Sequence, residues 1–136
     1  MKKKQFLFLG ILSILLSACG THYSSNDIII EAESVLNEYP DSAYQLLSSI
    51  PHPEQLPMAD FAAWCLHYTH AQYKTYREIK SDSLINIAVE YYADSKLKKY
   101  KGTAYYMSGC VSELLNQTYG QSNSSLQKCN SCIGRN

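Results

Sequence analysis

Four side chains in this sequence have the types and spacing of a metal site. His67 and His70 are three residues apart and would share one face of a helix, while Cys129 and Cys132 form a Cys-x-x-Cys pair of the kind found in zinc sites. The histidines, however, lie in an aromatic-rich segment where an imidazole ring can serve as core packing, and no carboxylate is evident to orient them. We therefore predict that the protein holds no metal and no other cofactor.

The same cysteine pair raises the question of redox chemistry. No strand-to-helix pattern precedes Cys129, as a thioredoxin-like motif would require, so we favour a disulfide between Cys129 and Cys132 in an oxidising compartment. Cys65 and Cys110 fall inside predicted helices, where we expect both to be buried and unpaired. The sequence shows no Ser-His-Asp arrangement, no pair of catalytic carboxylates and no glycine-rich phosphate loop. We predict that the protein is not an enzyme.

The beginning of the chain predicts export. Lysines at positions 2–4 precede an apolar run over residues 6–18, which is too short to span a bilayer as a helix and is typical of a cleavable signal peptide over residues 1–18. The sequence Leu16-Ser17-Ala18-Cys19-Gly20 resembles the lipobox of bacterial lipoproteins. That resemblance implies cleavage before Cys19 and fatty acylation of this cysteine, with palmitate for example, so that the membrane becomes a partner through the lipid anchor. The alternatives are an ordinary signal peptide or an uncleaved anchor.

Cellular location and charge limit the possible partners. No Asp follows Cys19, which favours the outer over the inner membrane and a domain in the periplasm or at the cell surface. The whole chain is neutral, with 12 basic and 12 acidic residues, and loss of three lysines with the signal leaves a net charge of −3. Because nucleic-acid binding needs clustered Lys and Arg, we exclude nucleic acid as a partner.

Apolar spacing after the signal predicts an all-α fold. Residues 19–26 are small and polar and form a spacer, and five segments then carry apolar residues at helical intervals: residues 28–39, 43–50, 61–76, 84–92 and 100–114. Three prolines between residues 51 and 57 mark a loop. The third segment has two apolar faces and is expected to be buried on two sides. The glutamates are expected on solvent-exposed helix faces: Glu31, Glu33, Glu38 and Glu90.

Two landmarks recur at an interval of 41 residues, which predicts stacked helix pairs. Asp41-Ser42-Ala43 corresponds to Asp82-Ser83-Leu84, and Ala63-Trp64 corresponds to Ala104-Tyr105. We interpret Asp41, and Ser81 or Asp82, as helix N-caps, although both triplets also resemble an O-glycosylation motif of exported proteins of Bacteroidetes. The sequence thus predicts antiparallel helix pairs stacked as an α-solenoid.

Three stretches resemble the tetratricopeptide-repeat-like lipoproteins of Bacteroidetes, namely residues 32–50, 81–88 and 101–109. The resemblance implies a scaffold that binds a protein or peptide, with Tyr105 as the large aromatic residue of a first helix and Gly109 as the small residue where helices touch. Ser108 and Ser112 depart from the family pattern, which has Leu and Tyr there. Several relatives continue into a transmembrane helix and a cytoplasmic signalling or DNA-binding part.

The end of the chain does not complete a third helix pair. Residues 118–125 and 134–136 are mostly polar or small, and the only aliphatic residues after Leu115 are Leu126 and Ile133. Arrays of this type usually need at least three repeats and a cap. We therefore predict a helical-repeat domain over residues 27–116, a disordered tail over residues 117–136 and truncation of a longer protein; the alternative is a short native tail.

Tyrosine is the main aromatic residue, with 12 copies against one Trp and three Phe. A tyrosine offers apolar area with a polar tip, which suits a groove that holds a partner segment. We place four tyrosines nearest such a groove: Tyr68, Tyr73, Tyr105 and Tyr106. The predicted function is that of a membrane-anchored scaffold for a protein or peptide in the cell envelope. The alternatives are a truncated sensory ectodomain of a signalling or transcription regulator, a metal- or redox-active lipoprotein, and a carbohydrate-uptake lipoprotein.

Overall fold

The computed structural model describes residues 24–133, with side chains for residues 24–118. The predicted signal peptide, Cys19 and the side chains of Cys129 and Cys132 lie outside this range, so the predictions for them stay predictions.

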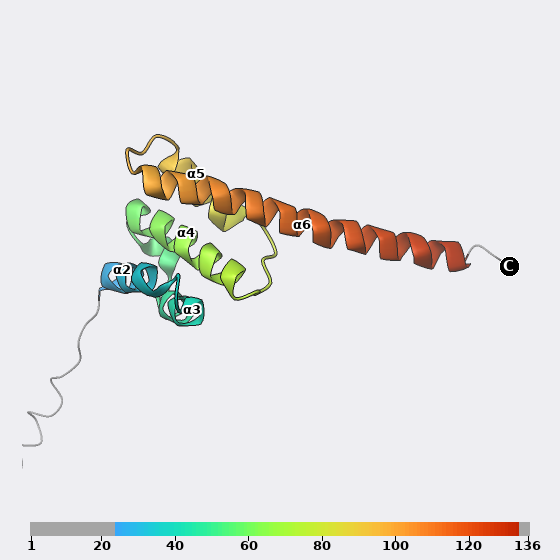
Figure 1. Ribbon diagram of the computed structural model, residues 1–136, viewed down its shortest axis with the longest axis horizontal. Coiled ribbons are helices and arrows are strands. Elements are labelled where there is room, and N and C mark those ends of the chain that lie inside the picture. Colours follow the sequence, from blue (N-terminus) through green and yellow to red (C-terminus); the bar gives the residue numbers. More distant parts are fainter. Residues whose placement is uncertain (1–23, 134–136) are drawn as a thin grey trace, which may run out of the picture.

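Helices make up the fold, and residues 24–133 contain no strand. The elements are α2 (Ser25–Val35), α3 (Pro40–Ser48), the short 3-10 helix η1 (Pro53–Gln55), α4 (Met58–Lys74), α5 (Ser83–Ala93) and α6 (Lys98–Ile133) (Figure 1). Each α-helix packs against the next one in the chain, and α4 also contacts α2 and α6. The prediction of an all-α fold of antiparallel helix pairs packed in series is confirmed.

Local chemistry explains where the first two helices begin. Ser24 caps α2 through a capping box, in which its Oγ accepts from the backbone N–H of Asp27 at 3.3 Å and its own N–H donates to the Asp27 carboxylate at 3.3 Å. The α3 helix begins at Pro40, because the proline ring fixes a helical φ and the first helical residue needs no N–H donor. Asp41 therefore lies in the first turn and is not the N-cap, which corrects our interpretation; its carboxylate pairs with Arg77 at 3.2 Å.

The prediction of Ser81 or Asp82 as the N-cap of α5 is confirmed for the position of Asp82 only. Asp82 is the N-cap residue of α5, but its side chain makes no capping hydrogen bond.

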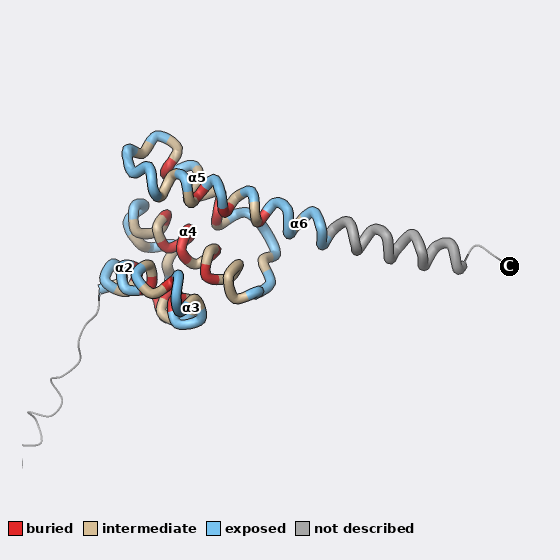
Figure 2. Tube along the Cα trace, viewed as in Figure 1, coloured by how far each residue is buried: buried red, intermediate tan, exposed pale blue. Residues whose placement is uncertain are grey.

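Buried residues recur along the helices and are most frequent on α4 (Figure 2). This helix buries residues that face both neighbouring pairs, as its two apolar faces predicted: Ala62, Trp64, Cys65, Leu66, His67, Thr69 and Ala71. Cys65 is buried and free, as expected, whereas Cys110 is free but only half-buried. The core of the described domain therefore centres on α4.

Aromatic rings join α3 to α4. The Trp64 ring stacks on Tyr68 with centroids 4.6 Å apart, and Tyr68 stacks on Tyr44 at 5.2 Å. The guanidinium of Arg77 lies over the Tyr44 ring at 4.0 Å, which extends the stack with a cation–π contact. The indole N–H of Trp64 donates to the carbonyl of Leu47 at 2.9 Å, so the one polar atom of this ring is satisfied inside the core.

The last helix is longer than the sequence predicted. We expected the helical domain to end at residue 116 and a disordered tail to follow, whereas α6 continues to Ile133 and extends past the packed helices (Figure 1). The chain has no proline after position 57, so no residue in this segment is obliged to break the helix.

The α6 glycines also differ from expectation. A Cβ atom added at Gly102 or Gly109 would meet no atom within 4 Å, so Gly109 faces open space and is not a point where described helices touch. A glycine inside a helix is less favourable than alanine by about 0.5–1 kcal/mol.

No helix among residues 24–133 is long and apolar enough to cross a membrane.

Removal of the Trp64 ring tests the importance of the aromatic stack. We expect Trp64→Ala to lower the free energy of unfolding by about 3–5 kcal/mol, because a large cavity forms and the carbonyl of Leu47 loses its donor. Urea denaturation followed by circular dichroism measures this loss. The exposed Tyr91 of α5 supplies the control, since Tyr91→Ala removes a ring outside the stack; an equal loss in both variants would contradict the assignment.

Candidate functional site

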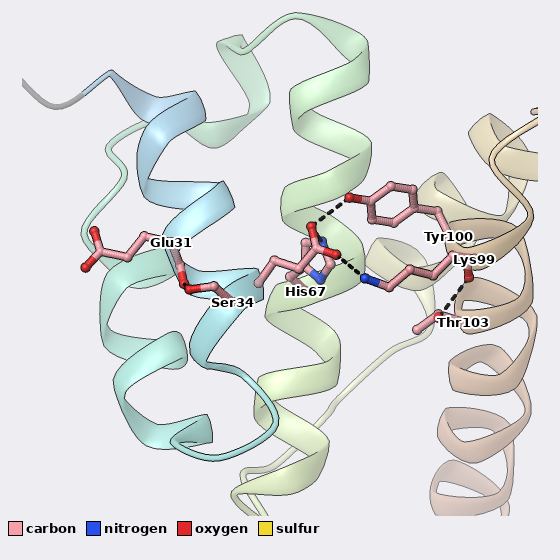
Figure 3. A network of polar contacts seen from close by, with 7 residues as sticks. Glu31, Ser34, His67, Lys99, Tyr100 and Thr103 are labelled. Atoms are coloured by element: carbon pink, nitrogen blue, oxygen red, sulfur yellow. Dashed lines mark hydrogen bonds and ion pairs between the residues drawn. The ribbon is translucent and has the colours of Figure 1, made fainter.

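A carboxylate connects the three helices α2, α4 and α6. Glu33 of α2 accepts a hydrogen bond from the Lys99 ammonium at 2.7 Å through Oε1 and one from the Tyr100 hydroxyl at 2.6 Å through Oε2. The Nε2 atom of His67 on α4 lies 3.6 Å from the same Oε2. Figure 3 shows that Lys99 and Tyr100 of α6 point toward His67 across the face that the three helices share.

Glu33 is partly buried, so its contacts determine the pKa of its carboxyl group. Its side chain is 23% exposed, and burial alone would raise the pKa of the carboxyl. The hydrogen bonds from Lys99 and Tyr100, together with the charge of Lys99, outweigh burial and lower this pKa below its usual value. The carboxylate is therefore ionised at neutral pH. We expected Glu33 on a solvated face, which is wrong, because the α4 and α6 side chains cover it.

His67 is the most buried polar member of the network. The residue is 5% exposed, and its ring meets the Tyr100 ring edge-on at a centroid distance of 5.9 Å. Burial, aided by the charges of His70 and Lys99, lowers the pKa of His67 to about 4 against the attraction of Glu33. The imidazole is neutral at neutral pH, so its approach to Glu33 is not an ion pair, and Nε2 has no hydrogen-bond partner among the described residues.

Tyr100 is fixed as a donor. Its hydrogen bond to Glu33, followed by burial and the Glu33 charge, raises the pKa of the phenol to about 12. The hydroxyl therefore keeps its proton at neutral pH and holds the carboxylate in place.

A cavity of about 210 Å³ opens beside this network. Its lining comes from all three helices and the turn after α2: Glu33, Leu36, Asn37, His67, His70, Lys99, Tyr100 and Thr103. Such a space suits a small polar group, because imidazole, ammonium, amide and hydroxyl groups line it.

A larger cavity of about 670 Å³ adjoins it where α4 ends. Asn37 lines both cavities, and its side-chain and main-chain oxygens accept hydrogen bonds from Lys74 at 3.1 and 3.2 Å. Aromatic, aliphatic and cationic side chains line the larger cavity, among them Tyr73, Arg77 and Leu114. We call the two cavities together the α4 groove. The residues of the Glu33 network line only the smaller cavity, and Asn37 is the lining residue that the two cavities share.

The predicted metal ligands are only partly brought together. His67 and His70 both line the smaller cavity, but among the side chains that the structure describes no three from His, Cys, Asp or Glu gather as a metal would require. Cys129 and Cys132 lie outside the described side chains. For His70, burial is the main cause of a lowered pKa, as for His67, so both rings behave as neutral groups.

The four predicted groove tyrosines do not form one cluster. Tyr68 lies in the aromatic stack between α3 and α4, where its hydroxyl bonds to that of Tyr44 at 3.3 Å. Tyr73 and Tyr106 both lie near Cys110, and interaction with its thiol raises the pKa of each phenol. Tyr105 is 50% exposed on α6. Of the four, Tyr73 alone lines the α4 groove.

Sequence reasoning missed Glu33, Lys99 and Tyr100 as site residues. Residues of these types are common on amphipathic helices, so their spacing along the chain does not predict that they contact one another. Glu33 and Lys99 are 66 residues apart, and only the packing of α2 and α6 on either side of α4 brings them together.

Comparisons of the chain with protein families, curated proteins and solved structures found no match.

Burial of His67 predicts an acid-sensitive fold. Because the pKa falls from 6.5 in the unfolded chain to about 4 in the fold, the unfolded state binds the proton more tightly in this window. The free energy of unfolding should decrease as the pH is lowered from 6.5 toward 4, by up to about 1.4 kcal/mol per pH unit. Urea titrations at a series of pH values measure the slope.

A variant assigns this slope to His67. His67→Gln keeps a neutral polar side chain and should reduce the slope, with the contribution of His70 remaining. The same exchange at the exposed His52 is the control, and a slope unchanged by His67→Gln would contradict the assignment.

Proposed function

We propose that this protein is a membrane-anchored helical-repeat lipoprotein, similar to tetratricopeptide-repeat lipoproteins, that holds a protein or peptide segment in the bacterial cell envelope. The observation that carries the proposal is the α4 groove, in which two adjoining cavities share Asn37 and lie between side chains of helices distant in sequence. Stacked helix pairs commonly bind extended segments along a surface of this kind.

The chemistry of the groove favours a peptide over a small metabolite. The larger cavity combines the Tyr73 ring and the Leu114 side chain with the cations Lys74 and Arg77, which suits an apolar side chain with a neighbouring carbonyl or carboxylate. The smaller cavity offers polar groups beside His67 and Lys99, which suit the next residue of the same segment. A segment that spans both cavities would bury more surface than either cavity alone provides.

The first residues of the sequence support the proposed lipid anchor. The lipobox-like sequence before Cys19 supports acylation, and the polar spacer over residues 19–26 would separate the helical domain from the membrane. The domain would then face the periplasm or the cell surface.

Peptide selection tests the groove. A displayed library of random short peptides is selected on the full chain, and fluorescence anisotropy then measures the affinity of a selected peptide for variants. We expect Tyr73→Ala to weaken binding by about tenfold or more, because an aromatic anchor is lost from the larger cavity. Tyr91→Ala, which removes an exposed tyrosine of α5 outside the groove, should leave affinity unchanged. If no peptide is selected, or if Tyr73→Ala binds as tightly as the wild type, the proposal is wrong.

Metabolic labelling tests the anchor independently. Cells that express the full chain and receive labelled palmitate should yield labelled protein in the membrane fraction, and Cys19→Ser should yield none because the acceptor thiol is absent. Cys110→Ser is the matched control and should keep the label. A labelled Cys19→Ser protein, or an unlabelled wild type, would show that this cysteine is not the anchor.

A further inference from the structure

One face of α6 carries residues that no described helix covers. Ala104, Met107 and Val111 point into the core, and the helical period places Lys98, Gly102, Tyr105, Gly109 and Glu113 on the opposite side, where all five are exposed. We call these five residues the outer face of α6. It is distinct from the α4 groove, to which none of the five contributes.

The composition of the outer face is unusual for a surface exposed to water. Tyr105 is 50% exposed, and the adjacent Tyr106 at the border of the face is 64% exposed. Large exposed aromatic rings on one helix are typical of protein contact sites. The two glycines weaken the helix, and a Cβ atom at either would touch nothing within 4 Å, so no contact among the described residues requires them. Glycine on a helix face lets another helix approach closely.

The outer face is complementary to itself. When a copy of α6 is laid antiparallel on the face, with the twofold axis between Tyr105 and Tyr106, Gly102 lies opposite Gly109 of the second copy. Tyr105 then lies opposite Tyr106 of the second copy, and Lys98 lies opposite Glu113 of the second copy. The same arrangement repeats on the other side of the axis, so two cations meet two carboxylates and each pair of rings lies beside two open glycine positions.

We propose that a second copy of this chain docks on the outer face of α6 and forms an antiparallel, twofold-symmetric dimer. The charge pairing between Lys98 and Glu113 selects this occupant over an unrelated helix, because each copy supplies both partners at matching distances from the axis. The contact runs for about 23 Å along each helix. One helix pair of this length buries less surface area than the interface of a stable dimer. The dimer is therefore weak and depends on concentration.

Sedimentation equilibrium of the full chain in detergent, over a range of protein concentrations, tests the proposal. The wild type is expected to change from monomer to dimer as concentration rises. Gly102→Leu and Gly109→Leu each place a branched side chain where the second helix must approach, and each is expected to remain monomeric at the concentrations where the wild type dimerises. Thermal unfolding followed by circular dichroism controls for folding, because leucine favours a helix more than glycine and both variants should melt no lower than the wild type.

Charge exchange distinguishes this dimer from other associations. Lys98→Glu and Glu113→Lys should each weaken self-association by about tenfold, because two attractive pairs become repulsive. The double variant Lys98→Glu/Glu113→Lys should recover wild-type association. An equal mixture of the two single variants should form a mixed dimer, because each position 98 then meets a position 113 of opposite charge.

Three results would overturn the proposal. The first is a wild type that stays monomeric over the whole concentration range. The second is a dimer that persists in both leucine variants, which would place the contact elsewhere. The third is a double charge variant that associates no better than the single variants, which would exclude the antiparallel register.

Discussion

The Glu33 carboxylate ties together helices that otherwise meet only through α4. A row of helices that pack mainly on their sequence neighbours has few long-range restraints, because each pair contacts only the next. Glu33 supplies such a restraint by accepting from Lys99 and Tyr100, 66 and 67 residues further along the chain. A partly buried carboxylate without these donors would be unfavourable, so its position fixes how α6 lies relative to α2.

Helix α4 makes different kinds of contact on its two sides. Toward α3 it presents Trp64 and Tyr68, whose rings stack on each other while the indole N–H is satisfied by the carbonyl of Leu47. Toward α2 and α6 it presents His67, which is held neutral by burial beside the Glu33 network. The same helix thus stabilises the fold through ring packing on one side and shapes the groove on the other. A partner in the groove would contact this central helix directly.

The two proposed contact surfaces use separate side chains of the molecule. The α4 groove lies among α2, α4 and the inner side of α6, whereas the outer face of α6 points away from the core. The two surfaces are nevertheless neighbours, because Tyr106 of the proposed dimer contact and Tyr73 of the groove both lie near Cys110. A lipid anchor at Cys19, as proposed, would confine chains to a membrane and raise their effective concentration, which favours even a weak dimer.

The sequence by itself determined the all-α class, the five helical segments and the inward stripes, because helical periodicity and proline positions act locally. It also indicated the two buried faces of α4 and the burial of Cys65. It placed the start of α3 two residues late, since Tyr39 rather than Asp41 is the N-cap residue and the helix begins at Pro40.

Tertiary structure alone decided which polar residues meet. Glu33 carries the same local signal as the exposed Glu31, and only the packing of α2 and α6 on either side of α4 surrounds one of them with donors. The same holds for the tyrosines, since Tyr68 stacks in the core and Tyr105 faces outward although both were expected at one groove. Sequence spacing describes one helix at a time, whereas a site is formed by side chains from several helices.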